Sequence, residues 1–314
     1  MADKVLTLLD ATKLSGNDLA VGLVEEVTTY APELDRVIGR TIAGTTYKTM
    51  VRTALPAGPV FRNANEGVDL VASSYEQRVA QCYYIDGQLA VDEMVANAPD
   101  GFGRDMLLAQ ELSGLWQQKA IALGDQFYRG TTADAKGFAG LQASYDSTNM
   151  EVSAGGNPGA STSAWIVWVG LKGLHFVFGG NAGLNVGAWQ RQQVKDANSK
   201  SYMAWVNNLS GWIGLVVNHS KAIGRIKLIT SAKPLTDALL AELLAKFPLS
   251  IRNAGSLVCF INRTASMYLQ KSRTVALFGQ GVTRPSGAME LVAPPPTEAF
   301  GVPIVVTDSI RNDE

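Results

Sequence analysis

The chain has 314 residues, of which 46% are hydrophobic and 18% are charged, which is enough apolar material for one large domain or two modest ones. Its formal net charge is -1. Proteins that bind nucleic acid nonspecifically usually carry a basic excess, because phosphate contacts supply most of their affinity. The composition therefore argues against a protein that grips nucleic acid through its net charge.

The first 44 residues are predicted to form an N-terminal arm. Residues 18–29 predict a short amphipathic helix within it, because their apolar residues fall on one side. We expect that helix to stop before Pro32, since proline disfavours helical backbone in the residue that precedes it. No apolar run in the chain approaches the roughly 18 residues that a membrane helix needs, so no membrane partner is expected.

Residues 45–85 predict an extended loop made of two β-rich arms, 47–55 and 75–85, joined by a tip rich in proline and glycine. Arms of about 15 residues, at about 3.3 Å per residue, would reach roughly 50 Å. An isolated two-stranded ribbon is only marginally stable in water, so a projecting ribbon indicates that a neighbour covers it. A hairpin packed onto its own domain is the alternative that spacing leaves open.

The clearest helix is predicted over residues 100–130, where apolar residues recur at intervals of three and four. Asp100 is a candidate cap at its start, and Arg129 with Gly130 fits its end. About 26 residues at about 1.5 Å each give a helix of roughly 40 Å, which is long for an ordinary domain. Its apolar stripe is interpreted as core rather than as a cofactor site.

A glycine-rich loop at residues 155–163 precedes a set of segments typical of a largely buried antiparallel sheet. The predicted strands are residues 164–171, 174–178, 202–207, 211–217 and 223–229. Helix and strand then alternate, with a helix at 235–247, a strand at 257–261, a helix that Asn262 caps and that runs through 269, and a last strand at 302–306. This change from successive strands to alternating helices and strands predicts a subdomain boundary near residue 231.

No pattern of catalytic or metal-binding residues stands out. The only histidines, His175 and His219, lack carboxylates or cysteines at ligand spacing, and a metal site needs about three or four converging ligands. The glycine-rich residues 179–183 are not followed by the lysine of a phosphate-binding loop and predict a turn between strands. We therefore expect no catalytic residue, no cofactor-binding residue, no metal site and no enzyme activity.

The remaining conspicuous residues are given structural interpretations. Cys82 and Cys259 lie in apolar surroundings and are predicted to be buried free thiols. The carboxylate pairs at 25–26 and 92–93 are interpreted as a solvated helix face or turn. Four tryptophans gather in the sheet region and, without basic residues between them, predict a packed core rather than base stacking: Trp165, Trp168, Trp205 and Trp212.

Four blocks of sequence, in order along the chain, carry a resemblance to a known family. They are residues 44–67; residues 123–130 with 135–141; residues 164–170 through 211–217 and 225–226; and residues 258–263 with 300–308. In these blocks the chain resembles the major capsid protein of tailed double-stranded DNA bacteriophages with the Hong Kong 97-type fold. The resemblance implies an α+β fold that self-assembles into hexamers and pentamers of an icosahedral head enclosing DNA.

The resemblance also implies a division of the chain and a contact surface. The divisions are an N-terminal arm (1–44), an extended loop (45–85), a peripheral domain (86–230, with a spine helix at about 102–129 and a β-sheet) and an axial domain (231–314). Because the strands assigned to the peripheral domain precede the axial part, altered connectivity is expected. Eight residues at and near the loop tip are candidate subunit contacts: Arg52, Pro56, Gly58, Pro59, Phe61, Arg62, Asn63 and Glu66. We expect that trimming residues 50–66 leaves a folded subunit that no longer assembles.

Partners follow from the same resemblance. They are other copies of the chain, a separate scaffolding protein (because no long N-terminal extension is present), a portal protein, a decoration protein, and packaged DNA held without sequence specificity. The implied location is the virion capsid, with the host cytoplasm during assembly. Asn218 departs from the family, because such proteins often carry an acidic residue there, and the chain ends soon after Asp308.

Two other readings stay open on the sequence. A cellular encapsulin-like shell with the same fold would enclose a cargo enzyme. A soluble enzyme or an unrelated structural protein would show a bound cofactor or a lone-subunit species in solution.

Overall fold

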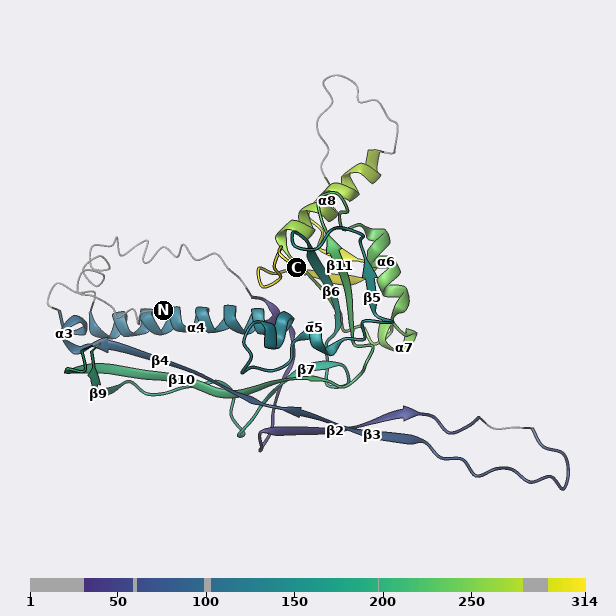
Figure 1. Cartoon of the computed structure of the whole chain (residues 1–314), viewed down its shortest axis with the longest axis horizontal. Helices are drawn as coiled ribbons and strands as arrows, with labels where there is room; N and C mark the ends of the chain where they lie inside the picture. Colours follow the sequence, from purple (N-terminus) through teal and green to yellow (C-terminus); the bar gives the residue numbers. More distant parts are fainter. Residues whose placement is uncertain (1–30, 59–60, 99–102, 197, 279–292) are drawn as a thin grey trace, which may run out of the picture.

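The computed structural model describes residues 31–58, 61–98, 103–196, 198–278 and 293–314. Two six-stranded sheets meet beside one long helix, α4 (Arg104–Arg129), and a two-stranded hairpin projects away from them (Figure 1). The helix predicted at residues 18–29 lies outside the described residues. The mixture of helix and sheet agrees with the predicted α+β class.

The first sheet has the order β1-β7-β10-β4, with β8 and β9 also paired to β10. Its strands are β1 (Gly39–Thr41), β4 (Tyr83–Asp92), β7 (Leu174–Phe178), β8 (Asn185–Val186), β9 (Gln190–Lys195) and β10 (Ser201–Val217). All of its pairings are antiparallel except that of β1 with β7. Helix α4 runs along one face of β4 and β10, so helix and strands together form an elongated arm (Figure 1).

The second sheet has the order β13-β14-β12-β6-β11-β5. Its strands are β5 (Glu151–Ser153), β6 (Thr162–Trp168), β11 (Ile223–Ile229), β12 (Leu257–Ile261), β13 (Glu298–Ala299) and β14 (Val302–Val306). Strands β12 and β14 have the bounds that their apolar runs predict. The remaining helices are α2 (Glu33–Arg36), α3 (Glu93–Ala96), η1 (Gly130–Thr132), α5 (Leu141–Ser144), α6 (Asp237–Lys246), α7 (Leu249–Arg252) and α8 (Arg263–Phe278).

The prediction of one antiparallel sheet over residues 164–229 is wrong. Strands β6 and β11 pair with each other and join β12 in the second sheet, whereas β7 and β10 belong to the first. These strands are largely apolar, and such runs do not reveal which neighbour they pair with. The boundary predicted near residue 231 thus falls between β11 and β12, which belong to the same sheet. The expected change of connectivity was based on placing all the strands of residues 164–229 in one domain, and the structure does not group them so.

Strand β10 is one continuous strand of 17 residues, where the sequence predicted two. Asn207, Asn208 and Gly211 suggest a break because asparagine and glycine are depleted in strands. Strand β4 pairs with β10 without interruption from Ala204 to Ile213 and holds the backbone extended through these residues.

Helix α4 confirms the predicted long helix but begins at Arg104, after Gly103 with φ 92°. The proposed cap Asp100 lies outside the described residues. The helix ends as predicted at Gly130, whose φ is 57° and where a Cβ would lie 2.1 Å from the backbone nitrogen of Gly140. The apolar stripe is core only in part: Leu123 and Phe127 are buried, whereas Met106 is 54% exposed.

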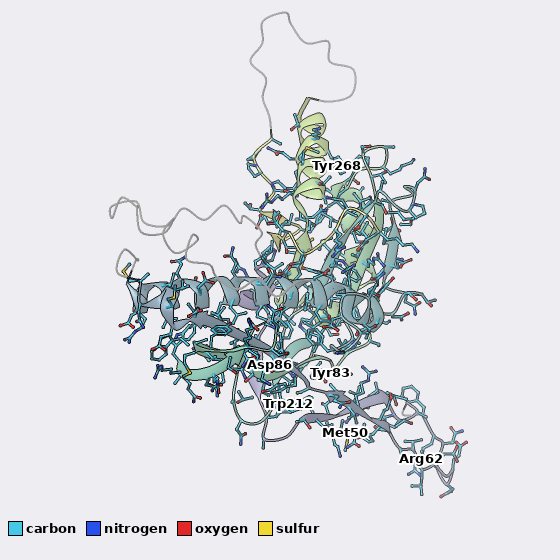
Figure 2. The ribbon with its side chains drawn as sticks, turned by 60° about the vertical axis from the view of Figure 1, so that its left-hand side comes forward. Met50, Arg62, Tyr83, Asp86, Trp212 and Tyr268 are labelled. Atoms are coloured by element: carbon cyan, nitrogen blue, oxygen red, sulfur yellow. The ribbon has the colours of Figure 1, made fainter. Side chains whose placement is uncertain are left out.

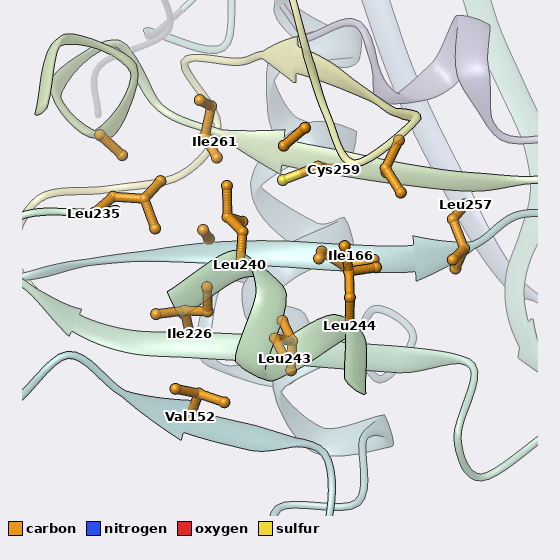
Figure 3. Packing of buried hydrophobic residues seen from close by; sticks show 14 of the residues in the cluster. Val152, Ile166, Ile226, Leu235, Leu240, Leu243, Leu244, Leu257, Cys259 and Ile261 are labelled. Carbon is orange, nitrogen blue, oxygen red and sulfur yellow. The ribbon is translucent and has the colours of Figure 1, made fainter. Parts of the chain in front are cut away.

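Two buried clusters cover the two faces of the second sheet. One lies between the second sheet and helices α6 and α8, where Ile166 and Ile226 contact Leu240 and Leu243 (Figure 3). The other lies on the opposite face of the same sheet, where Trp165 and Phe260 contact Phe127 of α4 and Phe176 of the first sheet. The C-terminal end of α4 is therefore the point at which both sheets share one core.

The four tryptophans divide between core and surface. Trp165 is 1% exposed, which confirms the packed interpretation for that residue. Trp212 is 37% exposed and packs edge-on against Tyr84 on the face of the first sheet away from α4. Trp205 is only half buried, and the guanidinium of Arg104 lies 5.2 Å from the centre of its ring.

Candidate functional site

The feature that stands apart from the cores is the hairpin formed by β2 (Thr46–Ala54) and β3 (Ser74–Gln81). It is a separate two-stranded sheet that extends beyond the body of the molecule (Figure 1). The predicted arm at 75–85 is split, because β3 ends at Gln81 and β4 begins at Tyr83 in another sheet. The buried Cys82 marks the change, since its amide donates a 2.8 Å hydrogen bond to Thr45 O at the hairpin base.

The hairpin has two unlike faces along its ladder. Residues directly opposite in an antiparallel pair share a face, so Tyr47 with Ala80 and Thr49 with Arg78 lie on one side. That side meets the body at the hairpin base. The other side carries large apolar residues in the open: Met50 is 73% exposed, Val79 58% and Tyr75 56%. Figure 2 labels Met50 on the projecting hairpin.

Arg52 lies opposite Tyr75 near the outer end of the ladder. Its guanidinium lies 5.5 Å from the centre of the Tyr75 ring and donates a 3.4 Å hydrogen bond to the phenol oxygen. The hydrogen bond and the positive charge of Arg52 lower the pKa of Tyr75. Arg52 therefore belongs to the rigid ladder rather than to the tip.

Beyond the ladder, a turn at residues 63–66 gives the tip local order. Asn63 N donates to the carboxylate of Glu66 at 2.9 Å, and Glu66 N donates back to Asn63 O at 3.3 Å. Arg62 closes the turn through a 2.9 Å hydrogen bond to Glu66 O. Asn65 takes the left-handed conformation, with φ 66°, which asparagine tolerates better than most residues.

The tip leaves large hydrophobic side chains uncovered within this subunit. Phe61 and Leu70 are fully exposed, and Leu55 is 74% exposed. Large apolar side chains exposed in this way are typical of a surface that another protein covers.

The hairpin base packs on the face of the first sheet away from α4. Cys82, Val177 and Val216 are buried there beneath Tyr47 and Ala80. Gly214 permits the close approach, because a Cβ at that position would lie 2.7 Å from Gln81 O. The base is therefore fixed to the body, whereas the outer ladder and the tip are not.

A polar contact and a groove flank this base. Arg78 donates a 3.0 Å hydrogen bond to Asn218 O, and the Asn218 side chain donates to Leu171 O at 2.6 Å. Asn218 therefore connects the hairpin to the turn that follows β6. A groove of about 820 Å³ lies between the hairpin base, the 138–146 segment and the end of β10.

The candidate contact residues are only partly brought together. Arg62, Asn63 and Glu66 form one turn, while Pro56, Gly58 and Phe61 are exposed on the same loop. Arg52 lies apart in the ladder, and Pro59 lies outside the described residues. The sequence-based prediction did not include three exposed apolar residues: Met50 and Val79 in the ladder, and Leu70 between the tip turn and β3. The alternation of side chains along a strand could have identified Met50 and Val79.

The residues considered for chemistry occupy structural positions. Asp92 accepts a 2.8 Å hydrogen bond from Met94 N at the start of α3, and Glu93 pairs with Arg191 at 2.8 Å. Gly180 and Asn181 turn the chain between β7 and β8 with positive φ. Cys82 and Cys259 are buried free thiols, as predicted. Within the described ranges, no three or more His, Cys, Asp or Glu side chains gather as metal ligands would.

In the described part of the chain, no helix is both long enough and apolar enough to cross a bilayer.

Comparison with known proteins identifies the family. The model of the family described as major capsid protein GP7 matches residues 34–314, so the chain belongs to that family. No curated protein matches the chain in sequence. The bacteriophage Epsilon15 structure, solved by cryo-electron microscopy, superposes with a TM-score of 0.73 at 19% identity, covering 100% of this chain and 98% of that one.

A structure from Mycobacterium phage Adephagia matches with a TM-score of 0.50 at 10% identity over 71% of this chain and 98% of that one. The protein is thus a major capsid protein of a tailed phage with the Hong Kong 97-type fold, as the sequence resemblance implied. An encapsulin complex from Synechococcus elongatus PCC 7942 matches at a TM-score of 0.47 and 9% identity, over 71% of this chain and 95% of that one. The family match favours the phage capsid over the cellular shell.

Proposed function

We propose that the protein assembles, with the β2–β3 hairpin as a main contact, into the hexamers and pentamers of an icosahedral head that encloses double-stranded DNA. The observation that carries this proposal is the hairpin itself. Its outer ladder and tip expose Met50, Phe61 and Leu70, which no described part of the body covers. A two-stranded ribbon with such a surface gains stability when another subunit packs on it.

The proposed contact residues act in different ways. Phe61 offers an apolar side chain that a neighbour can bury. Arg62 and Glu66 hold the tip turn and present charge beside it. Pro56, Gly58 and Pro59 restrict and turn the chain at the tip. Arg52 and Asn63 complete the set that we expect to meet an adjacent subunit.

The regions of the chain take the roles that the resemblance implies. We assign residues 1–44 to an arm and the hairpin to the extended loop. Helix α4 with β4 and β10 forms a stiff spine within the peripheral domain, and residues 231–314 belong to the axial domain. Because β6 pairs with both β11 and β12, one sheet joins the parts assigned to the peripheral and axial domains.

Further partners follow from a head that is built and filled inside a host cell. We propose a separate scaffolding protein, a portal protein and a decoration protein as partners during assembly in the host cytoplasm. Because the formal net charge of the chain is -1, we expect packaged DNA to be held without attraction through net charge and without sequence specificity.

Electron microscopy of the purified full-length protein, expressed alone and together with its neighbouring genes, tests the proposal. Closed shells of uniform size, or capsomers of five and six subunits, are expected. A monodisperse monomer under every condition would contradict it.

A further inference from the structure

His175 occupies an unusual position beneath the hairpin base. It lies on β7, with 0% of its side chain exposed. The Tyr47 ring of β2 covers it, with ring centres 5.5 Å apart and planes nearly perpendicular at 88°. Across the sheet, His175 is paired with Val216 of β10, which belongs to the same buried cluster as Cys82 and Val177. The imidazole is therefore part of the surface on which the hairpin rests.

The surroundings of the ring suit only its neutral form. Neither ring nitrogen makes a hydrogen bond of good geometry within the described part of the chain. Burial, and then the positive charge of Arg40 on β1, lower the pKa of His175, with the Gly170 backbone acting in the opposite direction. The Arg40 guanidinium lies 5.8 Å from the centre of the Tyr47 ring, on the ring that covers the histidine.

Glu76 of β3 and Asp146 line the groove beside the hairpin base, but among the described residues no carboxylate contributes to the pKa shift of His175. Arg78 of β3 is cationic and is directed to Asn218 O. Burial raises the pKa of Cys82, so its thiol stays neutral. Strand β10 contributes Val216, and beyond its end His219 lies near the cations Arg78 and Lys221. A proton taken up by His175 would place a second cation next to Arg40 in a buried site.

We propose that His175 is a pH-sensitive support for the hairpin: protonation of the imidazole in mild acid expels it from beneath Tyr47 and loosens the hairpin base from the body. Burying a charge without a counter-ion is costly, and separating Tyr47 from β7 lets water reach the imidazolium. The proton comes from solvent, and the change is reversible because no covalent bond is made or broken.

The sign follows from the direction of the shift. The neutral imidazole stabilises the docked base at pH values above the pKa that His175 has in the unfolded chain. That contribution is lost as the pH falls through the lower pKa that His175 has in the folded chain. The docked hairpin is therefore favoured at neutral pH and weakened in acid. The consequence for assembly rests on the proposed function of the hairpin, whereas the loosening itself does not.

Cys82 provides a direct reporter, since it is 1% exposed and belongs to the cluster under the hairpin base. We would measure its rate of reaction with dithiodipyridine, a disulfide reagent that attacks thiols in acid as well as at neutral pH. Cys259, which is also 1% exposed but lies in the core between the second sheet and its helices, serves as the internal control.

The comparison is between wild type and His175→Leu, each as the full-length chain, so that the intrinsic pH dependence of the reagent cancels. From about pH 7.5 to about pH 5, the wild-type rate at Cys82 should rise roughly tenfold relative to the variant, an energy difference of about 1.4 kcal/mol. The Cys259 rate should show no such change. If His175→Leu does not fold, His175→Gln, which keeps a polar side chain but cannot become charged, replaces it.

His219→Gln is the matched control, because these two residues are the only histidines of the chain. This variant should keep the wild-type response. A response that persists in His175→Leu or His175→Gln, that disappears in His219→Gln, or that Cys259 shares equally would overturn the proposal. If Cys82 shows the expected response in a protein that forms no shells, the role of His175 beneath the hairpin stands and only the proposed function is rejected.

Discussion

At the scale of single residues, the most telling group is a buried carboxylate that has no cation beside it among the described residues. Glu33 of α2 is 0% exposed, and one of its oxygens accepts a hydrogen bond from the Thr307 hydroxyl. The other oxygen and the buried Tyr128 hydroxyl lack partners of good geometry within the described residues. Burial raises the pKa of Glu33, so the folded chain favours the protonated acid.

Replacing Glu33 by glutamine should therefore stabilise the protein at neutral and higher pH. Because the pKa of Glu33 is raised in the folded chain, its protonated carboxyl stabilises the fold in acid, and this stabilisation is lost as the pH rises through that raised pKa. The glutamine side chain does not ionise, so the variant has no such loss. The gain over wild type should grow with pH and reach on the order of 1 kcal/mol. Denaturant unfolding of both chains across this pH range measures it. A variant that is less stable than wild type at every pH would show that the ionised form is well accommodated.

Gly214 gives a second prediction at this scale, concerning the approach of the hairpin to β10. A Cβ at this position would lie 2.7 Å from the Gln81 carbonyl oxygen, which is backbone and has little freedom to move. Gly214→Ala should destabilise the fold by about 1–3 kcal/mol and speed labelling of Cys82. The control is Gly114→Ala on α4, where a Cβ meets nothing within 4 Å and where alanine should instead add up to about 1 kcal/mol. Equal effects of the two substitutions would refute the packing argument.

Sequence alone did not reveal either position. Glu33 looks like an ordinary charged residue of a short helix, and its burial depends on Thr307, which lies 274 positions away. Gly214 sits within an apolar strand, where glycine signals a close approach but does not say of what. Packing against residues far away in the sequence determines the environment of both residues, and local sequence patterns do not predict such packing.

At the scale of elements, the N-terminus of α8 is the best-specified local feature. Asn262 accepts a 2.7 Å hydrogen bond from Ala265 N, as the predicted cap should. Its amide nitrogen also donates to Thr162 at 2.8 Å and to Asn312 at 2.6 Å. The cap thus fastens α8 to β6 and to the last residues of the chain.

Asn262→Ala should cost about 2–4 kcal/mol, since it removes the cap and leaves buried partners unpaired. Asn262→Asp keeps the capping oxygen and loses the hydrogen bonds that the amide donates, so its cost should be smaller. Thr236→Ala, at the cap of α6 with a longer bond of 3.4 Å, should cost about 1 kcal/mol or less. Thermal and denaturant unfolding rank the three variants, and an Asn262→Ala no worse than Thr236→Ala would contradict the assignment.

Elements with strong local signals were predicted well. Strands β12 and β14 and the C-terminal end of α4 follow from apolar runs and from one left-handed glycine, Gly130. The sheet that each strand joins was not predictable, because β6, β7, β10 and β11 are all largely apolar. The break at Cys82 was also missed, since nothing in its neighbours marks the point where the chain leaves the hairpin for β4.

At the scale of the whole molecule, the subunit combines a body with shared cores and a hairpin that its own cores do not cover. The body holds two sheets through the end of α4, and the hairpin projects from it (Figure 1). The outer hairpin leaves Met50, Phe61 and Leu70 exposed. The loop was recognisable from the sequence through its proline-rich tip and β-rich arms. Its apolar face toward a neighbour emerged only from the register of β2 with β3.

The measurement that tests this account most directly is electron microscopy of particles from a hairpin-shortened subunit beside wild type. Replacing residues 55–73 with a short glycine-containing turn removes the tip but keeps the paired strands. The shortened chain should fold with a wild-type unfolding profile and form no closed shells, because the contact between subunits is lost while both cores remain. Normal shells from the shortened chain would contradict the central claim that the hairpin holds the subunits together.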